Sequence, residues 1–245
     1  MIAAYVTNLG KYNEGELKGG YLKLPATKED VQALLSRIDV DGVMYEEFFI
    51  TDYEHNLQGL DNLGEFESLD ELNYLATLLE EMNDFDLEEF EMAAAHGDYS
   101  SSVKDLINLA QNPYCYSYYP DVCDNEDLGR YLVDELGYEE IPERLQGYFD
   151  YDSYGRDVSI GDGGEFVQHG GIMRGYLVRN HAESFIEHYS GRDDLPEEHK
   201  IFAYPKPEKS IKQTLANYKE MISSIPQAVT ERPLAIERRP AHESR

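Results

Sequence analysis

The sequence predicts an α+β protein made of three small modules and a basic C-terminal extension. Along the chain, the hydrophobic periodicity changes from strand-like alternation to helical spacing and back. Of the 245 residues, 41% are apolar and 12% are aromatic, which is enough to build a core. We expect an α+β module at residues 1–61, a helical module at 62–111, a second α+β module at 112–200, and a helix with a flexible basic tail at 201–245.

Three strands and one helix are expected in the first module. Residues 2–9, 21–24 and 45–51 are rich in β-branched and aromatic residues, as strands are. Thr27 and Asp30 have the spacing of a capping box. They precede a stripe of apolar residues at helical spacing, namely Val31, Leu34, Leu35 and Ile38.

Three helices are expected in the middle module. Ser68 can cap the first, whose leucines recur at positions 69, 72, 75 and 79. Asp86 is expected to cap the second, with Glu89 reaching back and Gly97 ending the helix. The third is expected at residues 102–110.

The third module has shorter elements. Residues 114–120 suit a connector or a strand, and residues 125–136 suit a helix with Leu128, Leu132 and Leu136 facing inward. Gly137 would end that helix. Further expected elements are a short helix opened by Pro142, strands at 176–179 and 201–204, turns at 161–164 and 170–171, and a basic amphipathic helix at 210–222.

The acidic residues are concentrated in the first two thirds of the chain. Residues 1–165 hold 38 Asp and Glu against 9 Lys and Arg, and the stretch 38–103 holds 19 acids and no base. Apolar residues are interleaved with these acids, so the stretch should fold with an anionic surface. An excess of 29 negative charges corresponds to about 15 base pairs of duplex DNA. Nucleic acid and anionic membranes would be repelled, so we expect a basic partner.

Catalysis is not expected. Asp52 with Glu54, or Asp150 with Asp152, could divide the roles of acid and base, but no catalytic motif surrounds either pair. The 7 histidines have no metal-ligand spacing, and the glycine-rich runs lack the lysine of a phosphate loop. We therefore expect no catalytic residue, no metal and no cofactor.

Two further expectations concern the cysteines and the cell compartment. Cys115 and Cys123 have no second Cys or His pair at zinc spacing, and we interpret them as buried thiols. The chain has no signal-peptide pattern at its start and no apolar run of 18 residues. We expect a soluble, cytoplasmic protein.

Several separated motifs resemble the ArdA antirestriction family. They lie at residues 5–15, 45–54 and 69–76, and at residues 136–157, which resemble the antirestriction motif of that family. The similarity extends over roughly residues 1–165 and becomes weaker towards residue 200. Residues 201–245, with 8 bases and 5 acids, depart from the family pattern.

The resemblance implies an elongated, non-enzymatic homodimer, joined through its third module and encoded on mobile genetic elements. It implies imitation of bent B-form DNA in the DNA-binding groove of the methyltransferase core of Type I restriction–modification enzymes. The expected DNA-mimic surface consists of Glu46, Glu47, Asp52, Glu54, Asp61, Glu65, Glu67, Asp70, Glu71, Glu80, Glu81, Asp84, Glu88, Glu89, Glu91, Asp134, Glu135, Glu139 and Glu140. The expected motif and dimer region consists of Leu136, Gly137, Glu143, Leu145, Tyr148, Phe149, Asp150, Tyr151, Gly155, Arg156 and Asp157.

Two other interpretations stay open. An acidic chaperone or binder of other basic DNA-binding proteins would need the same surface charge. A carboxylate hydrolase would need one of the two carboxylate pairs to lie in a pocket.

Overall fold

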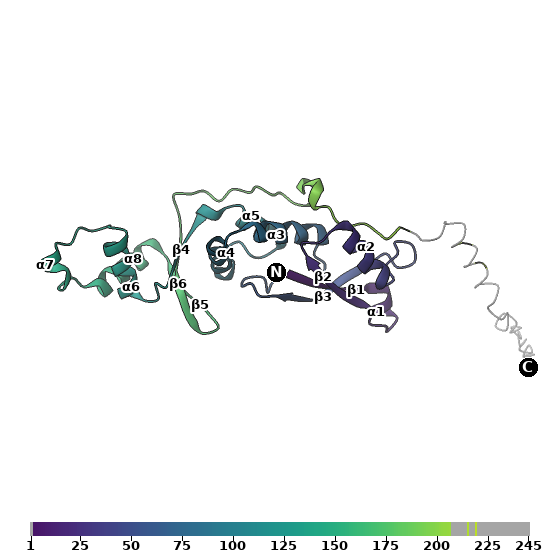
Figure 1. Ribbon diagram of the computed structural model, residues 1–245, viewed down its shortest axis with the longest axis horizontal. Coiled ribbons are helices and arrows are strands. Elements are labelled where there is room, and N and C mark those ends of the chain that lie inside the picture. Colours follow the sequence, from purple (N-terminus) through teal and green to yellow (C-terminus); the bar gives the residue numbers. More distant parts are fainter. Residues whose placement is uncertain (1, 207–214, 216–218, 220–245) are drawn as a thin grey trace, which may run out of the picture. The chain divides into compact units, whose positions relative to one another are not determined.

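The computed structural model describes residues 2–206, 215 and 219 (Figure 1). The chain divides after Pro205, and the described residues up to that point form one compact unit. The expected helix at 210–222 lies outside the described residues except for Leu215 and Lys219, and the tail beyond it lies wholly outside. In the described part of the chain, no helix has the length and apolar composition needed to cross a membrane.

This unit begins with an antiparallel sheet in the order β2–β1–β3. Its elements are β1 (Ile2–Asn8), α1 (Leu9–Asn13), β2 (Gly19–Leu24), α2 (Lys28–Arg37) and β3 (Phe48–His55). The capping box at Thr27 and Asp30 is present at the start of α2, as expected. The third strand begins three residues later than expected, because the Asp41 carboxylate accepts the N–H groups of Val43, Met44 and Tyr45 and holds them in a loop.

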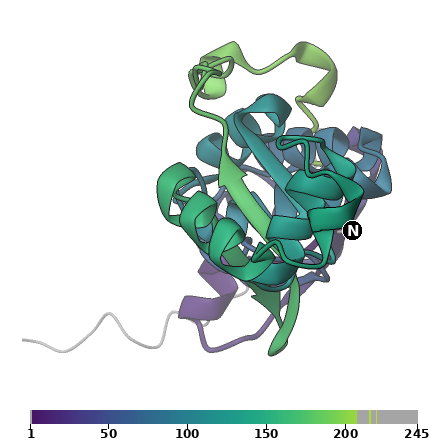
Figure 2. The ribbon, with the colours of Figure 1, turned by 90° about the vertical axis from the view of Figure 1, so that its left-hand side faces the viewer.

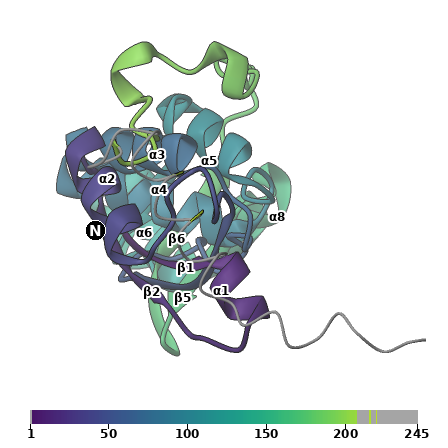
Figure 3. The ribbon, with the colours of Figure 1, turned by 90° about the vertical axis from the view of Figure 1, so that its right-hand side faces the viewer.

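Three helices follow, and α2 and α3 cover one face of this sheet (Figures 1 and 3). They are α3 (Leu69–Glu81), α4 (Asp84–His96) and α5 (Val103–Ala110). Ser68 and Ser102 cap α3 and α5 as expected. Asp86 does not cap α4, contrary to expectation. Asn83 caps it instead, because its side-chain oxygen accepts the N–H groups of Phe85 and Asp86 at 3.0 Å.

A second antiparallel sheet, in the order β4–β6–β5, carries the remaining helices. Its elements are η1 (Pro113–Cys115), β4 (Tyr116–Pro120), α6 (Asn125–Arg130), η2 (Tyr131–Glu135), α7 (Glu143–Gln146), α8 (Tyr151–Asp162), β5 (Glu165–His169) and β6 (Ile172–Arg179). Side chains alternate along a strand. Tyr116 and Tyr118 therefore join the large core of the first sheet and α3–α5, whereas Tyr119 packs against a second, smaller core with side chains of α6 and α8. Figure 2 views the chain from the end that carries these helices.

Leu136 is 41% exposed, although the helical spacing predicted that it faces inward. The reason is η2, a π-helical turn in which the Leu136 N–H donates to the carbonyl of Tyr131 at 3.0 Å. A π-helical turn takes an extra residue and so rotates the residues after it away from the predicted face.

Residues 180–205 form an irregular segment, here called the strap, which contains the 3-10 helices η3 (Arg192–Asp194) and η4 (Glu197–His199) and passes along α5 and α3 (Figure 1). The Asn112 side chain donates to the Ile186 carbonyl at 2.8 Å and accepts the Ile186 N–H at 3.0 Å. One turn earlier on α5, Asn108 makes the same pair of hydrogen bonds with Tyr189, at 2.8 and 2.9 Å. These buried amides replace a strand partner for the backbone of the strap.

Residues 201–204 do not form the expected strand. The N–H groups of Ile201 and Phe202 donate to the Asp70 carboxylate on α3, at 2.8 and 2.6 Å. Because the Asp70 side chain accepts these N–H groups, this end of the strap does not need to pair with another strand. The expected module boundaries at residues 61, 111 and 200 stay predictions.

The closest approach between α6 and α8 depends on two glycines. A Cβ at Gly155 would lie 2.0 Å from the Asn125 carbonyl oxygen, and a Cβ at Gly129 would lie 2.1 Å from that of Tyr151. Both distances are far inside van der Waals contact, so the two backbones can touch only where no side chain intervenes.

Gly155→Ala should therefore destabilise the protein by about 1–3 kcal/mol, because α8 must move away from α6. Gly161→Ala is the matched control on the same helix, where a Cβ would meet nothing within 4 Å. There, alanine should stabilise the helix by about 0.5–1 kcal/mol. Urea denaturation measures both values, and equal effects of the two changes would contradict the close approach.

Candidate functional site

Most of the expected DNA-mimic surface is exposed. Thirteen of its nineteen carboxylates are exposed: Glu46, Glu47, Asp52, Glu54, Asp61, Glu65, Glu80, Glu81, Asp84, Asp134, Glu135, Glu139 and Glu140. Five are half-buried: Glu67, Asp70, Glu88, Glu89 and Glu91. The exposed carboxylates come from the β3 region, from the ends of α3 and α4, and from the segment after α6.

Glu71 is not part of this surface, and its assignment there is corrected. It is 6% exposed, accepts a hydrogen bond from the Tyr189 hydroxyl at 2.9 Å, and pairs with the Arg192 guanidinium at 2.8 Å. Because both partners belong to the strap, Glu71 joins the strap to α3. Asp70, which accepts two strap N–H groups, also has a structural role.

The other surface carboxylates have no ionic partner within the described residues. Among the nineteen, Glu71 is the one that forms a salt bridge in the part of the chain that the structure describes. The bases of this part pair instead with acids outside the set, for example Lys104 with Glu187 and Arg130 with Glu126. The exposed set therefore keeps its negative charge.

Asp52 and Glu54 lie on one face of β3, as their spacing predicted. The Tyr21 hydroxyl of β2 donates to Asp52 at 2.7 Å, and Glu54 interacts with the same hydroxyl. The hydrogen bond to Asp52 is the main reason that the pKa of Tyr21 is raised. All three side chains are exposed, and of the pair Asp52 lines a pocket together with Asp61 and Glu65, whereas Glu54 does not line that pocket.

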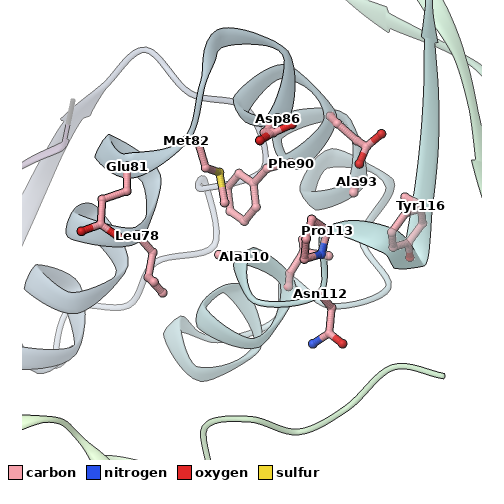
Figure 4. Close-up of a pocket in the computed structure, with 12 residues that line it drawn as sticks. Leu78, Glu81, Met82, Asp86, Phe90, Ala93, Ala110, Asn112, Pro113 and Tyr116 are labelled. Atoms are coloured by element: carbon pink, nitrogen blue, oxygen red, sulfur yellow. The ribbon is translucent and has the colours of Figure 1, made fainter. Parts of the chain in front are cut away.

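A pocket of about 230 Å³ opens among α3, α4, α5 and the residues before β4 (Figure 4). Most of its wall is apolar and includes Met82 and Phe90. Three carboxylates also line it, those of Glu81, Asp86 and Glu89. In Figure 4, Glu81 and Asp86 lie on different sides of the apolar wall.

Glu89 is the most perturbed carboxylate of the pocket. Desolvation, with a smaller contribution from the charge of Asp86, raises its pKa to about 7, although one oxygen accepts the Tyr118 N–H at 3.0 Å. Burial also raises the pKa of Glu91, with Glu88 adding to it. Elsewhere, hydrogen bonds lower carboxyl pKa values, as at Asp150, where the Ser153 backbone N–H is the main cause.

Three members of the expected motif, Asp150, Tyr151 and Gly155, help to hold α6 and α8 together. Asp150 caps α8 by accepting the Ser153 N–H at 3.1 Å. The Tyr151 hydroxyl donates to Asp134 at 3.1 Å, and the Arg130 guanidinium lies 4.4 Å from the centre of the Tyr151 ring. Together with Gly155, these residues have a structural role within the protomer, which does not depend on contact with a partner.

Eight of the eleven members of the expected motif are exposed. Its exposed members include three apolar residues, Leu136, Leu145 and Tyr148, which are 41%, 47% and 87% exposed. Phe149 is half-buried and packs against Tyr151, with ring centres 4.9 Å apart. The remaining exposed members are Gly137, Glu143, Asp150, Arg156 and Asp157, and the last two form a surface ion pair of 3.6 Å.

The pocket includes a carboxylate that sequence reasoning did not place on the surface, that of Asp86. Its spacing of three residues from Glu89 puts both side chains on one face of α4, so the sequence did contain a signal. The opposite wall, from α5 and residues 112–116, has no sequence signal because these segments meet α4 only in the folded chain.

Within residues 2–206, no group of three His, Cys, Asp or Glu side chains is placed so that it could hold a metal ion. Cys115 is buried as expected, but Cys123 is only half-buried. The candidate site is the set of thirteen exposed carboxylates without an ionic partner in the described residues.

Comparison with known proteins agrees with the sequence resemblance. A family model described as antirestriction protein (ArdA) matches residues 4–173. No curated protein matches the chain.

The raised pKa of Glu89 makes stability depend on pH. Between its ordinary value of 4.5 and about 7, the folded state binds a proton that the unfolded state has lost, so stability falls as the pH rises through this window. At about pH 8, Glu89→Gln should raise stability by about 1 kcal/mol, less than the full shift implies because the carboxylate is partly solvated. At about pH 5 most of the gain should disappear.

Thermal unfolding at both pH values measures this effect. Glu198→Gln, at an exposed position without a salt bridge in the described structure, is the control and should change the midpoint little at either pH. A Glu89→Gln variant that is less stable than the native protein at about pH 8 would show that the ionised carboxylate contributes to folding.

Proposed function

Because the chain belongs to the ArdA family of antirestriction proteins, we propose that it inhibits Type I restriction–modification enzymes by imitating DNA. It occupies the groove in the methyltransferase core that otherwise binds the duplex. The protein acts by binding alone, and the inhibition requires no cofactor.

One observation carries this proposal: thirteen exposed carboxylates have no ionic partner within the described residues. A groove that binds duplex DNA presents Lys and Arg to the phosphates. Counterions are released from the DNA when these bases pair with the phosphates. A folded surface with many unpaired carboxylates can pair with the same bases. Asp52 and Glu54 lie on strand β3, and Glu80, Glu81 and Asp84 lie at helix ends, so these five carboxylates are in place before binding.

We retain an acidic chaperone as the alternative. It needs the same charge but no particular arrangement, since non-specific attraction depends mainly on net charge. The two functions therefore differ in whether the position of a carboxylate matters.

Position can be tested with two variants of equal net charge. The first changes four exposed surface carboxylates to amides: Glu54, Glu65, Glu80 and Asp84. The second changes four exposed carboxylates outside the surface: Glu29, Glu183, Asp193 and Glu198. The measurement is competition with duplex DNA for a purified Type I methyltransferase.

The first variant should weaken competition by about tenfold or more, and the second by much less. A single change such as Glu54→Gln should alter it by less than about twofold, because each exposed charge is screened. Equal losses in the two fourfold variants would favour the chaperone. No competition by the native protein at about micromolar concentration would contradict the proposal.

The exposed apolar side chains Leu136, Leu145 and Tyr148 support a dimer joined through the motif region. A two-fold dimer doubles the span of charge, so it would correspond to about 30 base pairs. Such a span suits an enzyme that reads two separated half-sites.

Leu145→Ser with Tyr148→Ser should therefore give monomers in sedimentation velocity. Phe149 is left unchanged because it packs against Tyr151 and Tyr154 within the protomer. Leu17→Ser is the control, since Leu17 is 85% exposed and lies far from the motif in sequence. A double variant that remains dimeric would place the interface elsewhere.

A further inference from the structure

The pocket between α3, α4 and α5 is a concave and largely apolar part of the acidic surface. Its volume of about 230 Å³ is below the roughly 300–1,000 Å³ of pockets that hold small-molecule ligands. It is large enough for one long side chain. Duplex DNA has no counterpart to such an apolar recess beside its phosphates.

The carboxylates of the pocket favour binding of a cation. Glu81, Asp86 and Glu89 all line it, and none of them forms a salt bridge in the described part of the chain. Glu89 is half-buried, and its one hydrogen bond in the structure comes from the Tyr118 N–H. Desolvation without a neighbouring cation raises the pKa of Glu89. A bound cation would therefore offset the unfavourable free energy of keeping this carboxylate ionised.

The apolar wall selects among cations. Phe90 and Tyr116 provide aromatic rings, and Leu78 and Met82 provide aliphatic surface. A guanidinium is planar, weakly hydrated, and able to stack on rings while it donates to carboxylates. An ammonium is more strongly hydrated, so it would lose more on entering the recess. The methylene groups of an arginine can lie along the aliphatic wall.

We propose that this recess, here called the arginine pocket, binds one arginine side chain from the DNA-binding surface of the partner enzyme. The identity of the partner depends on the proposed function, whereas the chemistry of the pocket does not. Arginine is frequent in DNA-binding grooves, where it contacts phosphates and base edges. The pocket therefore adds one localised contact to an otherwise distributed electrostatic attraction.

The pocket can be tested without the enzyme. Butylguanidinium serves as the probe and neutral butylurea as its matched control, with the full chain at about pH 8 so that Glu89 is ionised. Butylguanidinium should cause saturable shifts in the backbone amide signals of Phe90, Ala93 and Ala110, and butylurea should not. Shifts that are spread evenly over the exposed carboxylates, or that are equal for both probes, would overturn the proposal.

Two variants test the residues. Glu89→Gln keeps an oxygen for the Tyr118 N–H but removes the charge, and should weaken butylguanidinium binding at least about fivefold. Ala110→Leu fills the recess and keeps all three carboxylates, and should also weaken it. Glu29→Gln removes an exposed carboxylate on α2 and should leave butylguanidinium binding unchanged. Unchanged binding in Glu89→Gln would overturn the proposal even if Ala110→Leu failed to fold.

The enzyme then separates the two proposals. Glu89→Gln should weaken competition with duplex DNA by about tenfold, although Glu54→Gln changes it less than about twofold. If the native protein competes but the two variants are equal, the arginine pocket is wrong and DNA mimicry stands. If the native protein does not compete, the proposed function is wrong, and the butylguanidinium titration still decides the pocket.

Discussion

Repulsion among carboxylates is the constraint that the rest of this structure must satisfy. With a formal net charge of −28, the chain gains little from surface ion pairs and must obtain its stability from apolar packing. The large core accordingly includes residues from Ile2 to Ile201. Some acids are also used locally, since Asp30, Asp124 and Asp150 accept backbone N–H groups at helix starts. Their charge there stabilises the helices.

The second sheet joins the two cores. Because β4 places Tyr116 and Tyr118 on one face and Tyr119 on the other, the same strand packs against α4 and against α6 with α8. The strap adds a second link, through the amides of Asn108 and Asn112 and through the pair of Glu71 and Arg192. The exposed carboxylates are thus positioned by packing and backbone hydrogen bonds beneath them. A surface held in this way loses little conformational freedom on binding.

In the proposed function, the acidic surface combines two kinds of recognition. Exposed carboxylates attract a basic groove over a long distance and contribute little individually, whereas a partly desolvated carboxylate in an apolar recess acts at short range on one group. The first kind acts over a long distance and increases the rate of association. The second can discriminate an arginine from another cation, which charge alone does not do.

The sequence by itself determined the features that depend on neighbouring residues. The capping box at Thr27, the serine caps of α3 and α5, the apolar stripes and the excess of acids are all local, and so are the motifs that placed the chain in its family. The same local reasoning placed the cap of α4 at Asp86, whereas Asn83 caps it, because both residue types can start a helix. It likewise could not detect the π-helical turn that exposes Leu136.

The tertiary structure alone decided which acids face outward and what lies beside them. Glu71 has the spacing of a surface carboxylate on α3, yet Arg192, 121 residues away, neutralises it under the strap. Gly155 meets the Asn125 carbonyl only after α8 has packed on α6. The walls of the arginine pocket come from three helices and the approach to β4. Contacts between distant residues form when the chain folds, so the spacing of residues along the sequence does not contain them.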